Sequence, residues 1–187
     1  MGFRANTDHG TTAILLTLGI SFGILAVAAA FEEAFFRGYI LQTFSRAGFA
    51  WPAIKVTALF FASAHITNPG ANWISVANTA LAGIWFGVAY LKTRNLWFPF
   101  GLHLTWNWTQ GAIFGIEISG LKELITAPLL REVDHGPAWL TGGDYGLEAS
   151  LACTIALIAS TLIIWYAPFI NASKEMTDLT SHERIAE

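Results

Sequence analysis

A run of uncharged, mostly apolar residues, TTAILLTLGISFGILAVAAA (11–30), leads directly into FEEAFFR (31–37), which holds two glutamates and an arginine. About 20 apolar residues are enough for a helix to cross the hydrocarbon core of a bilayer. In lipid, backbone polar groups must pair within the chain, so such a segment folds as a helix. The fold must therefore accommodate ionisable side chains near the end of a membrane helix.

Four more apolar segments follow the first one along the chain. Only 12% of the 187 residues are charged, about half of what is usual in a soluble domain, and 54% are hydrophobic. These features predict an all-α, polytopic transmembrane bundle of about five spanning helices. The first segment is too long for one straight crossing, so we expect it to tilt, bend or extend along the interface. The five predicted segments cover residues 11–44, 51–67, 73–91, 97–116 and 149–170.

The composition also limits the domain organisation and the function. We expect one domain over 1–187, with a helical core at 11–170 and a polar tail at 171–187. The net charge of −3 offers no basic surface for nucleic acid. The first run also fits a secretory signal, but the later segments keep the protein in the bilayer in either case. We therefore expect a multi-pass integral protein of the plasma or inner membrane.

The charged cluster of the first segment has a helical spacing. Glu33 and Arg37 are four residues apart, so on a helix they share a face, and the glutamate comes first, which is the better orientation for a pair. Glu32 is rotated by about 100° from Glu33, so we expect it to point into a cavity. The alternative is that all three side chains extend to the membrane interface from a helix end.

Two other segments carry polar residues at helical spacing. Phe61 and His65 share a face of the second segment, whereas His103, Asn107 and Gln110 form a polar stripe on the fourth. Such residues also occur as packing groups or as hydrogen-bonded seams between helices. Counted from the same side, His65 lies about 20 Å along its helix and His103 about 10 Å along its own. They meet only if the helices tilt or if residues 96–101 dip into the membrane.

Together, the clusters supply a carboxylate, two imidazoles and a carboxamide on three separate segments. A carboxylate in low-dielectric surroundings holds protons more tightly, which suits a general base near neutral pH. One histidine can hold the attacking water, while a second histidine and an amide can donate to a developing oxyanion. No serine or cysteine lies in a nucleophile motif, so water-dependent bond cleavage is favoured over covalent catalysis.

In this order, the three clusters resemble the motifs of the CPBP family, also called the CAAX-protease or Abi-type family of intramembrane proteases. The resemblance covers about residues 20–165, and WLTGGDYGLEASL (139–151) also looks like a segment that follows the core in some members. The motifs EExxxR, FxxxH and HxxxN read here as Glu32-Glu33…Arg37, Phe61…His65 and His103…Asn107.

The resemblance implies an all-α membrane endopeptidase that acts on a lipidated protein or on another membrane-embedded peptide. It implies that Glu32 and His65 activate water and that His103 and Asn107 stabilise the oxyanion. Members commonly carry more spans upstream, so we expect a short member or an incomplete one. The remaining motif residues would support the site: Glu33, Arg37 and Phe61.

Two alternatives remain open from the sequence. Intramembrane glutamates and histidines are typical of proton relays, so the second hypothesis is a non-enzymatic protein, either a proton pathway or a bacteriocin-immunity scaffold. The third is a zinc enzyme, because Glu32, His65 and His103 are ligand types that zinc binds. These three lie on separate segments without an HExxH motif, so we favour glutamate-activated water with no metal or other cofactor.

Overall fold

A computed structural model describes residues 2–121, 123–133 and 136–180 of the chain, which are mostly helical. In chain order the elements are β1 Gly2–Ala5, α1 Thr11–Glu33, a π-helical stretch Ala34–Leu41, α2 Gln42–Arg46, α3 Ala50–His65, α4 Trp73–Thr93, α5 Trp97–Trp108, a second π-helical stretch Thr109–Ile113, β2 Leu130–Val133, α6 Ala138–Thr141, 3₁₀ turns Gly143–Tyr145 and Leu147–Ala149, α7 Leu151–Tyr166 and α8 Lys174–Thr180.

The first apolar segment forms one continuous helix over Thr11–Arg46, in which a π-helical stretch joins α1 to α2. A π-helical stretch widens the helix locally and is frequent at functional sites. Here it begins directly after Glu33, within the charged cluster. The structure thus gives the long first segment a local change of helix geometry where its ionisable side chains lie.

All five predicted segments contain helices, but their lengths differ. Within the described ranges, only Thr11–Arg46 and α4 are long and apolar enough to cross a membrane by themselves. The helices α3, α5 and α7 are shorter. The prediction of a mostly helical protein is therefore confirmed, whereas five crossings are not established by helix length.

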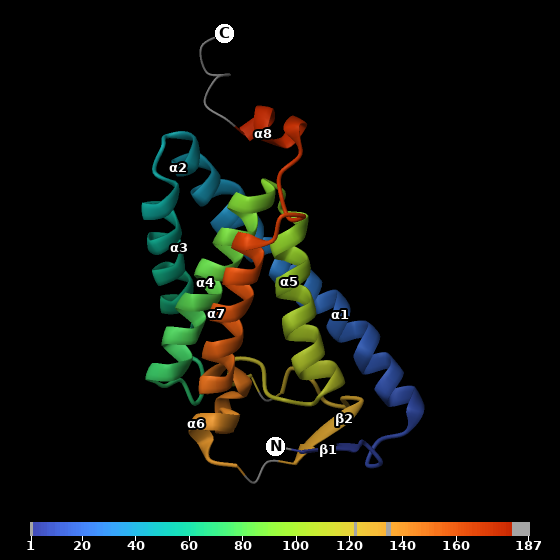
Figure 1. Cartoon of the computed structure of the whole chain (residues 1–187). Coiled ribbons are helices and arrows are strands. Elements are labelled where there is room, and N and C mark those ends of the chain that lie inside the picture. The colour runs from blue at the N-terminus through green and yellow to red at the C-terminus, as the bar shows by residue number, and fades with distance from the viewer. Residues whose placement is uncertain (1, 122, 134–135, 181–187) are drawn as a thin grey trace.

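Helix α4 packs between α3 and α7, and α1 packs along α5 (Figure 1). In this view α1 and α5 run down to the right, whereas α4 and α7 run down to the left. Gly83 allows α4 to approach α3 closely, because a Cβ atom at this position would lie 2.7 Å from the Cα atom of Ala58. The inclined helix pair and the close α3–α4 contact together determine where the polar side chains of three helices meet.

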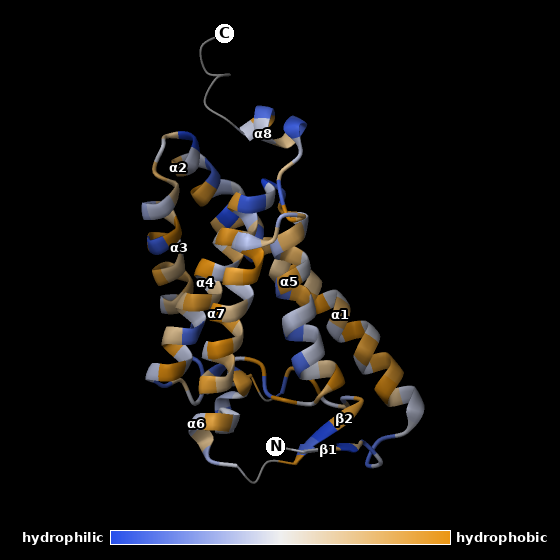
Figure 2. Cartoon of the chain, viewed as in Figure 1, coloured by the Kyte–Doolittle hydropathy of each residue, from blue (hydrophilic) through white to orange (hydrophobic). Residues whose placement is uncertain are grey.

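Large apolar side chains cover the outward faces of the helices, and Figure 2 shows the hydrophobic colour running along them. An apolar surface of this extent is expected where lipid, rather than water, surrounds a protein. Side chains that are more than half exposed include Leu15, Ile20, Val27, Phe60, Ile155 and Ile163.

The all-α prediction is not fully met, because two short strands pair beneath the helices in the view of Figure 1. Strand β1 pairs antiparallel with β2, with Gly2 opposite Val133 and Ala5 opposite Leu130. Each strand has four residues, which is too short for an alternating pattern to predict a strand from sequence. The region 117–148, expected as a polar loop, also contains α6 and two 3₁₀ turns. The predicted tail contains α8, and its end, 181–187, lies outside the described residues.

Candidate active site

Arg37 and Glu33 form a buried ion pair beside the site. Nη1 of Arg37 donates to Oε1 of Glu33 at 3.0 Å, and Nη2 donates to the carbonyl oxygen of Gly83 at 3.0 Å. The two side chains are 0% and 1% exposed, so they do not extend to an interface. Pairing reduces the large cost of burying an isolated charge. The four-residue spacing in the sequence correctly placed these two groups together.

His103 lies between two glutamates. Its Nδ1 atom is 2.9 Å from Oε1 of Glu33, and its Nε2 atom is 3.8 Å from Oε2 of Glu32. Because an ionised carboxylate can only accept hydrogen bonds, Nδ1 of His103 is the donor to Glu33. The imidazole also stacks on Phe86, with ring centroids 4.7 Å apart and planes 19° from parallel. These contacts fix both the position and the plane of the ring.

His65 is the last residue of α3, and Phe61 orients it. The Nδ1 atom of His65 is 2.8 Å from the carbonyl oxygen of Phe61, which can only accept, so Nδ1 carries a proton and a neutral ring keeps its lone pair on Nε2. The Phe61 ring also lies 4.8 Å from the imidazole of His65 and 6.0 Å from that of His103, between centroids. The two histidines therefore meet around Phe61 although they start from different depths.

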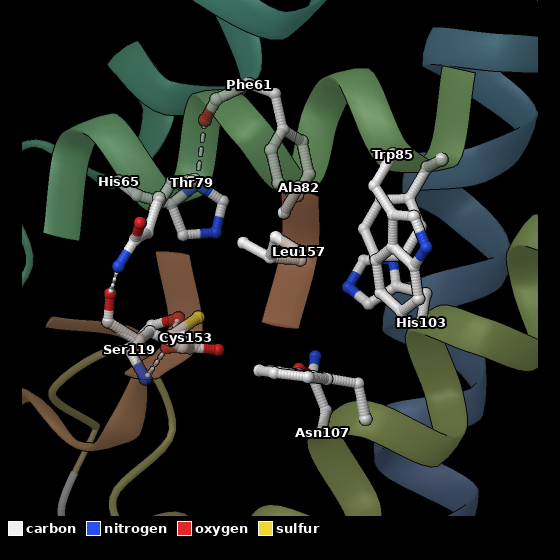
Figure 3. Close-up of a pocket in the computed structure, with 14 residues that line it drawn as sticks. Phe61, His65, Thr79, Ala82, Trp85, His103, Asn107, Ser119, Cys153 and Leu157 are labelled. Carbon is white, nitrogen blue, oxygen red and sulfur yellow. Dashed lines mark hydrogen bonds between the residues drawn. The ribbon is translucent and has the colours of Figure 1, made fainter. Parts of the chain in front are cut away.

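His65, His103 and Asn107 line one cavity of about 40 Å³ (Figure 3). A polar cavity of this size has room for one or a few water molecules. Glu32 is not part of its lining, but its Oε2 atom is buried without a hydrogen-bond partner and lies beside His103. The predicted residues are thus gathered around His103, with Glu32 adjacent to the cavity rather than in its wall.

Another part of the cavity wall consists of residues that sequence reasoning did not select, above all Glu148 and Ser119. Oε2 of Glu148 accepts from both the backbone N–H and the hydroxyl of Ser119, each at 2.7 Å. Nδ2 of Asn78 donates to the carbonyl oxygens of Glu148 and Ser150, each at 2.8 Å. Burial raises the pKa of the Glu148 carboxyl, although the hydrogen bonds from Ser119 act in the opposite direction.

The zinc alternative requires three ligands that converge on one point. Within the part of the chain that the structure describes, no three His, Cys, Asp or Glu side chains are grouped in this way. Nδ1 of His103 is bonded to Glu33 and Nδ1 of His65 is directed at a carbonyl oxygen. These bonds leave Nε2 of both rings free, as in metal-ligating histidines, so the argument against a single zinc ion is that Glu32, His65 and His103 do not converge in this arrangement. The chemistry considered below uses side chains and water.

A mostly helical chain with an apolar outer surface and a buried cluster of carboxylates, imidazoles and an amide is typical of proteins that carry out chemistry within a membrane. A family model described as type II CAAX prenyl endopeptidase Rce1-like matches residues 13–109, which is just over half of the chain. The chain belongs to this family of membrane-embedded proteases. No curated protein and no solved structure matched the chain.

The matched range includes all three motifs and ends before Ser119 and Glu148. The segment 139–151, for which a likeness to family members is expected, also lies beyond it, so that expectation stays a prediction. The cavity therefore combines side chains from the matched region with side chains from a region that the family match does not reach.

Proposed function

We propose that the chain is an intramembrane endopeptidase that hydrolyses a peptide bond in a membrane-embedded or lipidated substrate, with prenylated CAAX proteins as the first class to test. One observation carries the proposal: His65, His103 and Asn107 line a single water-sized cavity, and Glu32 lies 3.8 Å from His103. The family membership supports the same reaction class.

In the proposed reaction, Glu32 takes a proton from a water molecule that Nε2 of His65 helps to hold. The water oxygen attacks the carbonyl carbon of the substrate. The developing oxyanion accepts hydrogen bonds from the amide of Asn107 and from His103 in its imidazolium form, whose Nδ1–H is bonded to Glu33 and whose Nε2–H is left to donate. Donors fixed before the reaction stabilise such charge effectively, because they need not reorient during it. Glu33 and Phe61 fix the two imidazoles, and Arg37 balances the charge of Glu33.

The membrane arrangement belongs to the same proposal. We place α3, α5 and α7 in the bilayer beside the two longer helices, giving a multi-pass protein of the plasma or inner membrane. Phe60 on α3 and Ile155 and Ile163 on α7 are each more than 60% exposed, which supports contact of these helices with lipid. Locally thinned lipid and flanking side chains that extend to the interface allow shorter helices to span.

The proposal is tested with the purified chain reconstituted into liposomes. The substrate is a farnesylated peptide ending in a CAAX sequence, with its unprenylated counterpart alongside, and the products are measured by mass spectrometry. Glu32→Gln and His65→Ala should each lower the rate of cleavage by about 100-fold or more, the usual worth of a group that activates water.

Two substitutions serve as matched controls. Glu175→Gln changes an exposed glutamate of α8, and His9→Ala changes a histidine of the segment between β1 and α1. Both should cleave the peptide at the wild-type rate. Retained cleavage by Glu32→Gln or His65→Ala would overturn the proposal.

A further inference from the structure

Glu148 is a half-buried carboxylate that lines the same cavity as His65, His103 and Asn107, and the proposed reaction so far gives it no role. We propose that Glu148 is a second catalytic carboxylate, which gives the proton to the leaving nitrogen when the peptide bond breaks. This inference rests on the proposed function and adds a residue that lies outside the range of the family match.

The position of Glu148 is closely determined by its neighbours. Two donors of Ser119 hold its Oε2 atom at 2.7 Å, and the amide of Asn78 holds its backbone carbonyl at 2.8 Å. Oδ1 of Asn78 in turn accepts from the hydroxyl of Thr154 on α7 at 2.7 Å. A catalytic group must be held in a defined place, and these bonds from three different segments supply that requirement.

Three other polar side chains of the cavity already have hydrogen-bond partners. The amide of Asn78 donates to two carbonyl oxygens, the hydroxyl of Thr79 donates to the carbonyl oxygen of Ser75 at 2.8 Å, and the hydroxyl of Ser119 donates to Glu148. Cys153 belongs to the apolar core cluster. Apart from the two histidines, Glu148 is the group of this cavity best suited to transfer a proton.

The geometry of peptide hydrolysis assigns a direction to each group. In the tetrahedral intermediate, the oxyanion, the attacking oxygen and the leaving nitrogen point away from one carbon in different directions. If the oxyanion faces His103 and Asn107 on α5, and the attacking water lies beside Glu32 and His65, the nitrogen faces the remaining wall. Glu148 lines the cavity beside its partner Ser119, which Figure 3 shows well apart from Asn107 and His103.

The proton balance closes with the two carboxylates alone. Attack of water forms the C–O bond, and the proton from water goes to Glu32. The C–N bond then breaks as the carboxyl of Glu148 gives its proton to the nitrogen, which leaves as a neutral amine. Glu32 returns its proton to Glu148 through water in the cavity. Because burial raises the pKa of Glu148, its carboxyl holds this proton to a higher pH than an exposed glutamate would.

The experiment compares two substrates that differ in the leaving atom. The bond that the wild type cleaves is located by mass spectrometry, and its amide is then replaced by a thioester. A thiol has a pKa of about 8.5, so the sulfur of a thioester leaves as a thiolate without taking up a proton. The nitrogen of an amide must be protonated before it leaves as an amine. Glu148→Gln, which keeps an oxygen to accept from Ser119, should lower amide cleavage by about 100-fold or more while thioester cleavage stays within about threefold of the wild type.

Glu148→Asp provides a second test, because it keeps the acid but moves it by one methylene. It should also impair amide cleavage selectively, by about tenfold or more, and thermal unfolding in detergent verifies that each variant is folded. Equal loss with both substrates would mean that Glu148 only supports the structure, and full amide cleavage by Glu148→Gln would mean that it has no role. Either result overturns the inference.

Glu32→Gln separates this inference from the proposed function. It should lose both amide and thioester cleavage, because each requires activated water. If the wild type cleaves neither substrate, or if Glu32→Gln cleaves both, the proposed function fails. If Glu32→Gln behaves as expected but Glu148→Gln shows no preference for the thioester, only the inference about Glu148 fails.

Discussion

The Nδ1 atom of His103 lies 2.9 Å from Oε1 of Glu33, the same oxygen that accepts a hydrogen bond from Arg37 at 3.0 Å. One carboxylate oxygen thus orients an imidazole of the candidate site and also neutralises a fully buried guanidinium. The second guanidinium bond, to the carbonyl oxygen of Gly83, extends this network to α4. The orientation of His103 therefore depends on α1, α4 and α5 together.

Glu33→Gln should lower kcat about 5- to 10-fold, because the substitution replaces a charge-assisted hydrogen bond, worth about 1.5–3 kcal/mol, with a neutral one worth about 0.5–1.5 kcal/mol. It should also lower the free energy of unfolding by about 3–5 kcal/mol, since Arg37 is left as an unpaired buried charge. Cleavage assays on folded protein and unfolding in detergent measure the two effects separately.

Asp8→Asn is the control for this prediction. It breaks the pair between Asp8 and Arg131, whose side chains are 45% and 38% exposed and lie 3.1 Å apart. An exposed pair contributes about 0–1 kcal/mol, so the loss of stability should be small. A Glu33→Gln variant as stable and as active as Asp8→Asn would contradict the role assigned to the buried network.

Asn107→Ala should lower kcat about 100- to 1000-fold with little change in KM, as expected for a lost oxyanion donor. The same variant separates the enzyme from a proton pathway. A relay through Glu32, His65 and His103 does not need a carboxamide, so proton flux into liposomes would survive the substitution. The relay would be favoured by one combined result: the wild type and Asn107→Ala conduct protons equally well, and neither protein cleaves the peptide.

Helical spacing was sufficient to predict part of the site. The pairing of Glu33 with Arg37 follows from a separation of four residues, and the resulting bond is present. Spacing could not predict that Glu33 also binds His103, 70 residues away, because the contact depends on how α1 and α5 cross. For the same reason, Glu32 does not point into the cavity as its spacing predicted. Its side chain lies beside His103 and is not part of the cavity wall.

The region 117–148 was the least accessible to sequence reasoning. It has no periodic apolar pattern, so it was predicted as a loop. Its conformation is instead determined by individual bonds, such as those from Ser119 and Asn78 to Glu148. The positive φ angles of Gly142 and Gly146, 96° and 94°, suit glycine and end the short turns there. Such tertiary contacts leave little trace in a single sequence, so Glu148 was missed.

Chelation tests the expectation that no metal takes part. We expect cleavage to persist after dialysis against a strong chelator, because Glu32, His65 and His103 do not converge as ligands of one ion. The metal content of the purified chain is measured before and after dialysis, and the cleavage rate is compared with that of an untreated sample. Loss of cleavage that added zinc restores would show that these side chains rearrange to hold the ion.

Gly83→Ala should destabilise the protein, because the added Cβ atom would lie 2.7 Å from the Cα atom of Ala58 and 2.9 Å from its Cβ atom. The backbones of α3 and α4 must then separate, at a cost of about 1–3 kcal/mol. The same movement displaces the carbonyl oxygen that binds Arg37, so the cleavage rate of the folded protein should fall as well.

Gly23→Ala on α1 is the matched control: its new Cβ atom would meet nothing within 4 Å, and alanine favours a helix over glycine by about 0.8–1.0 kcal/mol. Unfolding in detergent should therefore show the two substitutions moving the stability in opposite directions, and equal stability of both variants would contradict the close approach of α3 and α4.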